Sequence, residues 1–442
     1  MYLADSRGAP AVVPQRGRRW AAVPGTVLAL GAVSLITDVS AEMITAVLPL
    51  YLVSGLGLSP LGFGVLDGVY NGVGALVRLA GGHLADGGGG RHKAVAVAGY
   101  GLSALCKPLL LVAHTLPVIG AVLALDRTGK GLRTAPRDAL ISLAAPPERR
   151  GQAFGVHRAM DTAGALCGPV LAFLVLGVAA EGYDAVFTVS ACVAALGVLV
   201  LVLFVPGRPG GVGVARSAAP SGPLRASALP RKAPALPRMP GLGRLAACAV
   251  LLGLTTVSDS FVYLLLQRRF EVPVQWFPLL PLGTAAAFLL LAVPAGAVAD
   301  RVGRRRLFLL GHLALLVAYG LVLAVPGGPL PAVVPVVVTV LVLHGTFYAA
   351  TDGVLAAAVA GVVPDAMRAR GLALVGTGQA LARFACSIGF GAAWTAWGDG
   401  PALAVATAGL AISTPIALAA LRPTPRPSRR RTTRPCDEKG TP

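Results

Sequence analysis

Runs of apolar residues recur along almost the whole chain, and each is long enough to be a transmembrane helix. An α-helix needs about 20 mostly apolar residues to cross the hydrocarbon core of a bilayer. The runs lack the two-residue alternation of a membrane β-barrel, and only helices and closed barrels satisfy their own backbone polar groups in lipid. The pattern predicts an all-α membrane protein with twelve transmembrane helices in two pseudo-symmetric six-helix bundles.

The expected spans also divide the chain into domains. The first six lie at residues 24–53, 60–85, 93–113, 116–138, 151–178 and 184–205, and the second six at 244–267, 275–299, 306–325, 331–361, 370–395 and 400–421. We expect a tail at 1–23, one bundle at 24–205, a linker at 206–243, a second bundle at 244–421 and a basic tail at 422–442. The linker is rich in proline and basic residues and holds no acidic one, a composition that does not form a core.

Charged residues make up only 13% of the 442 positions, yet the net charge is +19. The basic residues gather in alternate loops, in the linker and in both tails. By the positive-inside rule, these segments and both termini are cytoplasmic in a multi-pass plasma-membrane protein. Arg268 and Arg269 are the exception on the outer side, with Glu271 as a nearby partner. The charge therefore indicates a lipid bilayer as partner, and no nucleic acid.

A loop motif occurs twice in the chain. The complete copy runs Gly296-Ala-Val-Ala-Asp300-Arg301-Val-Gly303-Arg304-Arg305, and a shorter copy, Gly82-His-Leu-Ala-Asp86, lies 214 positions earlier and is followed by four glycines and Arg91. An acidic residue, glycines and basic residues at the end of one span predict a tight turn into the next. Asp138 and Asp352 repeat at the same offset. The repetition predicts two similar halves with a site at their interface, a known transporter architecture.

Ionisable residues inside the expected spans are candidates for the mechanism, because such groups are costly at bilayer depth. Asp38 and Glu42 lie four residues apart on one face of span one, and Asp259 lies at the corresponding place in span seven. Two carboxylates one turn apart resist joint ionisation, so one of them can carry a proton. With Arg127 of span four they form a candidate proton-coupling site. The alternative is that Asp38 simply pairs with Arg127 and stabilises the fold.

Other embedded polar residues are candidates for lining a substrate cavity. They are Asp67 and Asn71 on span two, Lys107 on span three, and Gln379 and Arg383 on span eleven. The excess of embedded bases favours an organic anion or zwitterion over a cationic drug. The sequence shows no nucleotide loop and no metal-ligand spacing, so we expect no cofactor, no metal and no enzymatic activity.

Three further charges have simpler expected roles. Arg158 and Asp161, three residues apart on span five, should form a local ion pair. Arg133 lies near the cytoplasmic end of span four, where a long basic side chain ordinarily extends to water. The six histidines, His344 among them, are scattered and are expected to be packing or surface residues.

The complete loop motif resembles the signature of the major facilitator superfamily, Gly-x-x-x-Asp-Arg-x-Gly-Arg-Arg, and the resemblance covers all but the linker and tails. Gly87 departs from it where the first copy should carry Arg. The resemblance implies two rocking six-helix bundles, with Asp86 and Asp300 bracing loop and helix ends in one conformation. Arg127 with Gly131 resembles the span-four motif of the family.

Span five resembles the signature of the family's proton-coupled antiporters. It carries Gly155, Gly164, Gly168 and Pro169 at the corresponding spacing, although Ala172-Phe173 replace a following glycine pair. Glycines on one face allow close helix packing, and proline bends the helix.

These patterns together predict a monomeric, proton-coupled secondary transporter that exports a small organic molecule by alternating access. A proton symporter for metabolite uptake is the alternative within transport, because the loop motif is common to both directions. A membrane receptor or scaffold with the same fold and no turnover is the alternative of another class.

Overall fold

The computed structural model describes residues 23–86, 92–146, 149–179, 182–206, 240–328, 330–351, 355, 359, 362–363 and 368–420. Within these ranges the regular structure is helical and no strand occurs. Among the described residues, eight helices are long and apolar enough to cross a membrane by length and composition alone. The other spans are interrupted or carry more polar and charged residues, as α4 does with Asp126, Arg127 and Lys130.

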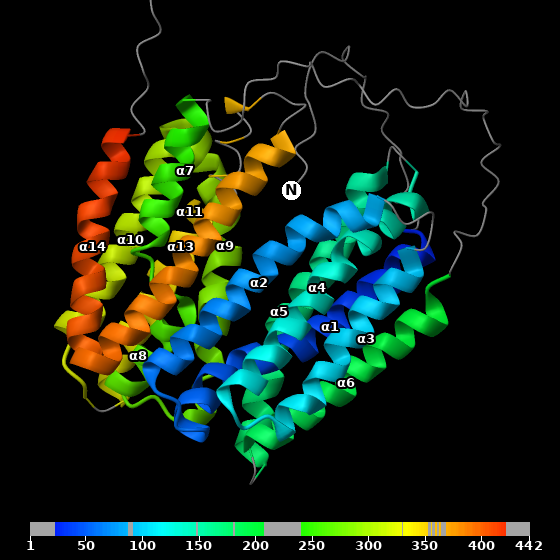
Figure 1. Cartoon of the computed structure of the whole chain (residues 1–442), viewed down its shortest axis with the longest axis horizontal. Coiled ribbons are helices and arrows are strands. Elements are labelled where there is room, and N and C mark those ends of the chain that lie inside the picture. The colour runs from blue at the N-terminus through cyan, green and yellow to red at the C-terminus, as the bar shows by residue number, and fades with distance from the viewer. Residues whose placement is uncertain are drawn as a thin grey trace, which may run out of the picture.

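The helices form two bundles of six spans each (Figure 1). The N-terminal bundle contains α1 (Gly25–Leu50), extended by the π-helix η1 (Tyr51–Gly55), α2 (Pro60–Asp86), α3 (His92–Val112), α4 (Leu116–Ala144), α5 (Arg150–Val178) and α6 (Gly182–Phe204). The C-terminal bundle contains α7 (Pro240–Gly253), α8 (Asp259–Arg269), the short 3-10 helix η4 (Val274–Trp276), α9 (Leu279–Val302), α10 (Arg304–Ala324), α11 (Leu330–Thr351), α13 (Arg368–Trp397) and α14 (Asp399–Ala420).

Span seven is broken, whereas the sequence predicted a continuous helix over 244–267. Helices α7 and α8 are separated by residues 254–258, which are not helical. The backbone N–H of Val257 in this break donates to the hydroxyl of Tyr319 at 3.0 Å, and the Thr256 hydroxyl donates to the Leu252 carbonyl at 2.8 Å. Non-helical backbone is tolerated at membrane depth where protein groups satisfy it. The break makes Asp259 the first residue of α8.

The tight turn predicted between spans eight and nine is present. Only Gly303 separates α9 from α10, and its φ of 93° is a conformation that glycine adopts without strain. Arg301 is exposed in the last turn of α9, and Arg305 donates to the Leu418 carbonyl near the end of α14. Gly296 lies in α9 with open space where a side chain would be.

The remaining motif residues are described only in part. Gly82 and Asp86 lie in the last turns of α2, Asp300 lies near the end of α9 and Arg304 begins α10, but the side chains of these residues lie outside the description. Arg91 and Asp352 lie outside the described residues altogether. The bracing role of the two aspartates stays a prediction.

Two of the three span-five glycines pack closely against α1. A Cβ at Gly168 would lie 2.8 Å from the Val39 carbonyl oxygen, and one at Gly164 would meet the backbone of Leu35. Pro169 is buried beside them. Gly155 has open space around it, so close packing does not explain that position.

The described contacts between the bundles lie toward one side of the molecule. We call the side where α1 begins and α14 ends the terminal face, and the side of residues 56–59, 113–115 and 270–278 the opposite face. Near the opposite face the Leu61 N–H of α2 donates to the Thr395 hydroxyl of α13 at 3.0 Å, and Gly391 of α13 packs on the Pro60 carbonyl. The ribbons converge here and separate toward the terminal face, at the top of Figure 1.

An aromatic cluster joins the bundles beside these contacts. The Phe261 ring of α8 lies edge-on to Phe63 of α2 and to Phe390 of α13, with centroids 4.9 Å apart in each case, and Trp394 packs on Phe390. Phe63, Phe261 and Phe390 are almost fully buried. Large apolar surfaces packed edge-to-face stabilise this junction and exclude water from it.

The basic pair at the end of α8 does not use Glu271. Arg268 lies 3.8 Å from the Asp399 carboxylate of α14, and Arg269 donates to the Leu323 carbonyl at 3.0 Å. Both partners come from neighbouring helices of the same bundle, so the pair ties the opposite-face ends of this bundle together.

Candidate transport site

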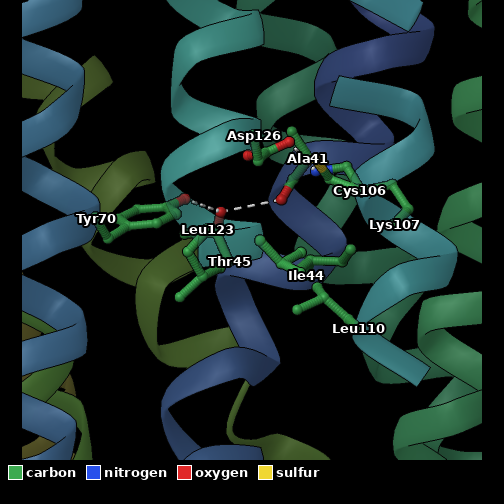
Figure 2. Close-up of a pocket in the computed structure, with 10 residues that line it drawn as sticks. Ala41, Ile44, Thr45, Tyr70, Cys106, Lys107, Leu110, Leu123 and Asp126 are labelled. Atoms are coloured by element: carbon green, nitrogen blue, oxygen red, sulfur yellow. Dashed lines mark hydrogen bonds and ion pairs between the residues drawn. The ribbon is translucent and has the colours of Figure 1, made fainter. Parts of the chain in front are cut away.

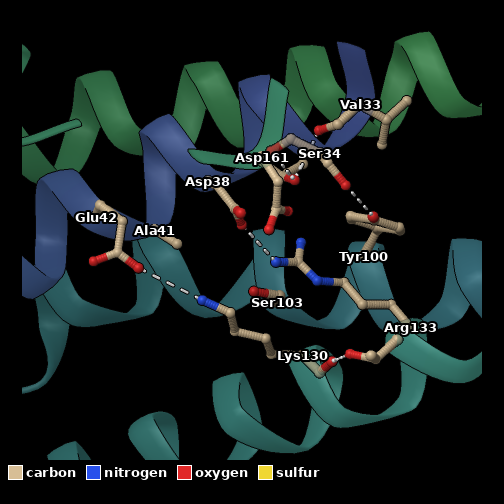
Figure 3. A network of polar contacts seen from close by, with 12 residues as sticks. Val33, Ser34, Asp38, Ala41, Glu42, Tyr100, Ser103, Lys130, Arg133 and Asp161 are labelled. Atoms are coloured by element: carbon tan, nitrogen blue, oxygen red, sulfur yellow. Dashed lines mark hydrogen bonds and ion pairs between the residues drawn. The ribbon is translucent and has the colours of Figure 1, made fainter. Parts of the chain in front are cut away.

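Asp38 of α1 forms a buried ion pair with Arg133 of α4 rather than with Arg127. The Arg133 guanidinium donates to Asp38 Oδ1 at 3.1 Å, and the two side chains are 4% and 12% exposed (Figure 3). The same guanidinium lies 4.4 Å from the centre of the Tyr100 ring. The expectation that Arg133 extends to water is therefore wrong, because α1 and α3 enclose it.

A second ionic group continues this network across α4 and α5. The Arg137 guanidinium donates to Asp138 at 3.1 Å and lies 3.6 Å from Asp161. Arg158 lies 3.4 Å from Asp161, as the spacing predicts, although its side chain is 79% exposed. The network links three helices of one bundle, so much of its charge serves packing within that bundle.

Glu42 and Lys130 form a separate and more open pair. Lys130 Nζ lies 3.6 Å from Glu42 Oε1, and Glu42 is one turn along α1 from Asp38. The Glu42 side chain is 28% exposed and the Lys130 side chain is 31% exposed. Asp38 and Glu42 therefore each have their own base, and the expected repulsion between the two acids is not their dominant interaction. The pair lies far from both ends of α1 and α4 and is more exposed than the pair of Asp38 and Arg133.

Arg127 keeps one buried hydrogen-bond donor, Nε, that no described residue satisfies. Its guanidinium lies 3.4 Å from the centre of the Tyr70 ring, its side chain is 15% exposed, and Nε has no partner. The nearest carboxylate oxygen, Oδ2 of Asp126, is 3.9 Å away. That carboxylate already accepts from Lys107 at 2.8 Å and from Ser103 at 2.6 Å. Arg127 is thus positioned by an aromatic ring, and its Nε donor is left for another acceptor.

Lys107 lies inside the N-terminal bundle. Its side chain is 5% exposed and neutralises Asp126 between α3 and α4, beside a small pocket that Thr45 and Tyr70 also line (Figure 2). The Thr45 and Tyr70 hydroxyls hydrogen-bond at 2.8 Å and so fix the ring on which Arg127 stacks. Because Lys107 pairs with the Asp126 carboxylate at close range, Arg127 is not hydrogen-bonded to that carboxylate.

The C-terminal bundle presents a matching arrangement around Asp259. The Asp259 carboxylate accepts from the Tyr348 hydroxyl at 2.5 Å and lies 3.3 Å from Nε2 of His344, and its side chain is 40% exposed. The Arg383 guanidinium lies 6.0 Å from the centre of the Tyr348 ring, and its Nε has no partner among the described residues. His344, expected to be a packing residue, is fully buried yet contacts the candidate acid.

The other expected cavity residues take different positions. Asp67 is buried and accepts from the Ser387 hydroxyl of α13 at 2.6 Å, so it joins the two bundles. Asn71 is exposed one turn further along α2 and donates to the Asp67 backbone carbonyl at 2.9 Å. Gln379 is half-buried on α13, one turn from Arg383. Asn71 and Gln379 are thus on the side of α2 and α13 nearer the terminal face.

Comparison with known sequences decides the family. The sequence profile described as Major Facilitator Superfamily matches residues 30–290 and 274–437, which is most of the chain. The chain belongs to the major facilitator superfamily. The two bundles of six spans are therefore the two halves of a facilitator, and the protein is a multi-pass membrane protein.

Relatives and solved structures agree with this assignment. An uncharacterised MFS-type transporter of Methanocaldococcus jannaschii is 34% identical over 182 residues, 41% of this chain and 44% of the relative, so the match spans less than half of either facilitator. The crystal structure of the nucleoside transporter NupG superposes with a TM-score of 0.75 at 14% identity, over 90% of this chain and all of that one. The peptide transporter POT in complex with sulfate gives 0.72 at 19% identity, over 92% and 96%. At these identities the likeness shows the fold alone.

Proposed function

We propose that this facilitator is a proton-coupled secondary transporter that exports a small organic anion or zwitterion by alternating access. The supporting observation is that each bundle carries a partly exposed acid within a span: Glu42, 28% exposed in α1, and Asp259, 40% exposed at the break in span seven. At membrane depth, ionisable side chains that face water mark substrate and proton pathways. The protein would act as a monomer in the plasma membrane with both termini cytoplasmic.

The shape of the molecule supports an alternating-access cycle. The aromatic cluster and the contacts of α2 with α13 close the opposite face, and the bundles separate toward the terminal face (Figure 1). If the termini are cytoplasmic, opening at the terminal face would give access to the cytoplasm. Rocking of one bundle against the other about a central site would open the opposite face.

Proton coupling would act through the exposed acids. Protonation of Glu42 removes its attraction to Lys130, and protonation of Asp259 changes a carboxylate that accepts from Tyr348 and lies beside His344. Asp38 is held by Arg133 in a drier environment and would connect such changes to the packing of α1 on α4. Each acid thus couples a proton to a different helix contact.

The two arginines supply the substrate chemistry. Arg127 and Arg383 each place a guanidinium beside a tyrosine ring, and the Nε of each has no partner within the part of the chain that the structure describes. A planar guanidinium binds a carboxylate or phosphate through two parallel hydrogen bonds, and the aromatic ring restricts its orientation. An ammonium group on the same substrate would pair with the carboxylate of Glu42 or Asp259. The two arginines and these acids together favour a zwitterion or anion over a simple cation as the substrate.

The direction of transport rests on span five. Gly168 packs on the backbone of α1 and on Cβ of Glu42, so the glycine pattern of the antiporter signature lies directly against the candidate coupling acid. A proton symporter for uptake would use the same acids and is the second candidate within transport. A non-transporting receptor would keep the fold without turnover.

Solute-dependent proton movement in proteoliposomes tests the proposal. Purified protein is reconstituted with an entrapped pH indicator, a proton gradient is imposed, and panels of carboxylates, phosphate esters, amino acids and organic cations are added one at a time. We expect proton flux with a subset of the anions or zwitterions, and loss of that flux in Glu42→Gln. Movement of the labelled solute against the proton gradient separates export from uptake.

Substitutions of the arginines give the substrate arm of this test. Arg127→Gln and Arg383→Gln should raise the solute concentration that gives half-maximal flux, because each removes a charged donor pair. Arg158→Gln is the matched control, because Arg158 is 79% exposed on the outside of the network. A protein that binds a solute yet moves neither solute nor protons would instead be a receptor.

A further inference from the structure

Asp67 sits where the two bundles are pressed together. On α2 its carboxylate Oδ2 accepts from the Ser387 hydroxyl of α13 at 2.6 Å, and its side chain is buried. The helices around it almost touch: Gly64 packs on the Ser387 carbonyl, and a Cβ at Gly68 would lie 2.6 Å from the Phe384 ring. Glycines without side chains allow this close approach, and Asp67 is buried within the contact.

Asp67 also differs from the other embedded acids in its partners. Asp38, Glu42, Asp126 and Asp161 each lie within 4.0 Å of an arginine or lysine, whereas in the described part of the chain no base lies that close to Asp67. A buried carboxylate without a cation costs several kcal/mol, and a protonated carboxyl avoids that cost. The closed contact therefore favours the neutral acid.

The titratable groups near Asp67 come from three neighbouring helices, α4, α8 and α13. Helix α2 packs against α13, α4 and η1. The neighbouring groups are Asp259 at the start of α8 and Cys386 of α13. On α4, Arg127 contacts α2 at Tyr70, and on α13, Arg383 precedes Ser387 by one turn.

The local partners of Asp67 are hydroxyl groups. Ser387 is the described residue that hydrogen-bonds to its carboxylate; Ser258 and Ser260 at the break in span seven lie nearby, and Ser258 Oγ has no hydrogen-bond partner among the described residues. The break therefore places two small hydroxyl side chains of the C-terminal bundle against an acid of the N-terminal bundle. A hydroxyl can donate to or accept from a carboxyl group, so Ser387 can hydrogen-bond to the neutral acid as well as to the anion.

We propose that Asp67 is a proton-carrying residue of the transport cycle: its neutral form holds α2 against α13 at the opposite face, and its ionised form releases that contact. The inference rests on the proposed function, because it assigns one of the coupled protons. When the O–H bond of Asp67 breaks, the proton passes to water that reaches Asp259 from the central site. The remaining anion then gains stability only if the helices separate and admit water.

This assignment fits an export cycle. A proton binds Asp67 when the opposite face is open, and the neutral acid favours closure there and opening toward the terminal face. Release of that proton on the terminal side then favours the return to the state open at the opposite face. The interaction with Ser387 breaks and re-forms once in each cycle.

A distance measurement across the opposite face tests the inference without substrate. Spin labels are placed at Thr115 of the N-terminal bundle and Pro326 of the C-terminal bundle, both exposed, in a variant whose native cysteines are replaced. Distance distributions are recorded by pulsed electron resonance from acid to alkaline pH. We expect the short-distance, closed population to fall as pH rises, by at most about tenfold in closed-to-open ratio per pH unit for one proton.

Variants separate a proton-carrying role from a structural one. Asp67→Asn, which is isosteric and stays neutral, should remain closed at every pH. Ser387→Ala keeps the acid but loses one bond of the closed state, so its transition should keep its steepness and shift to lower pH. Asp184→Asn, which changes an acid in the first turn of α6 at the opposite face, should behave as the unsubstituted protein does.

Two outcomes would overturn the inference. One is a closed population that does not change with pH in the unsubstituted protein. The other is an Asp67→Asn variant, or a Ser387→Ala variant if the first does not fold, that opens with the same pH profile as the unsubstituted protein. Neither outcome bears on solute flux, so failure here is distinguishable from failure of the transport proposal.

Discussion

The buried pair of Asp38 and Arg133 gives the sharpest prediction about stability. The two groups are 3.1 Å apart, with side chains 12% and 4% exposed, so neither can turn to water when its partner is removed. Breaking a buried pair by removing one partner costs about 3–5 kcal/mol, because an uncompensated charge remains. Arg133→Met should therefore destabilise the N-terminal bundle by about that amount.

The double variant Asp38→Asn/Arg133→Met removes both charges and should recover most of the loss. Replacing a buried pair by neutral groups of similar volume is often close to neutral. Arg158→Met is the matched control, because it also breaks an ion pair of this network, but an exposed one worth less than about 1 kcal/mol.

Thermal unfolding in detergent, followed by tryptophan fluorescence and by loss of the monodisperse peak in gel filtration, measures these differences. We expect Arg133→Met to lower the midpoint clearly more than Arg158→Met does, and the double variant to lie between them. If Arg133→Met and Arg158→Met were equally mild, the pair would not be buried as the structure shows. A double variant as unstable as the sum of its single changes would also refute the reasoning.

Further predictions follow from the packing and the turn, each measured by the same thermal assay. Gly164→Val should destabilise the fold by at least about 1–3 kcal/mol because its side chain would meet the backbone of α1, whereas Gly155→Ala, with open space around it, should be neutral or mildly stabilising. Gly303→Ala should cost about 1 kcal/mol or more because of the positive φ. Lys107→Met should also be clearly destabilising, since it removes the nearest base from the buried carboxylate of Asp126 and leaves it with Ser103 and the more distant Arg127, at 3.9 Å.

Hydropathy alone predicted most span ends to within a few residues. In lipid, each apolar run must satisfy its own backbone hydrogen bonds, so a helix is expected over its whole length. The turn at Gly303 was also predictable, since a glycine between an acidic helix end and a basic helix start has few other structural uses. The break in span seven was not predicted. Its polar residues, Thr255, Thr256 and Ser258, lie between two apolar runs, and a continuous helix accommodates such residues equally well.

The sequence could not predict which embedded base pairs with which embedded acid, and the reason is geometric. Arg127 and Arg133 lie on the same helix six residues apart, so they point to different sides of it. Which one meets Asp38 depends on how α4 is rotated. The contact of Gly99 with Gly129 helps set that rotation, because α3 and α4 approach there until a Cβ at Gly99 would lie 2.8 Å from the Gly129 carbonyl oxygen.

The C-terminal site was predictable only in part. Asp259 and Arg383 were candidates because charges are rare at membrane depth, but a single histidine on an apolar helix gives no such signal. His344 reaches Asp259 only because α11 packs against the start of α8 with Tyr348 one turn further on. Asp67 was expected to line a substrate cavity, but it is buried between the two bundles. Its burial depends on α13, which lies more than 300 residues later in the chain.

The central claim is that solute movement and proton movement are coupled, and one measurement tests it directly. Proteoliposomes without any initial pH difference are given a gradient of a solute that the protein binds, and the internal pH is followed. The account predicts a pH change that depends on the solute and the protein and is lost in Glu42→Gln. Equilibration of the solute with no change of internal pH in the unsubstituted protein would contradict it.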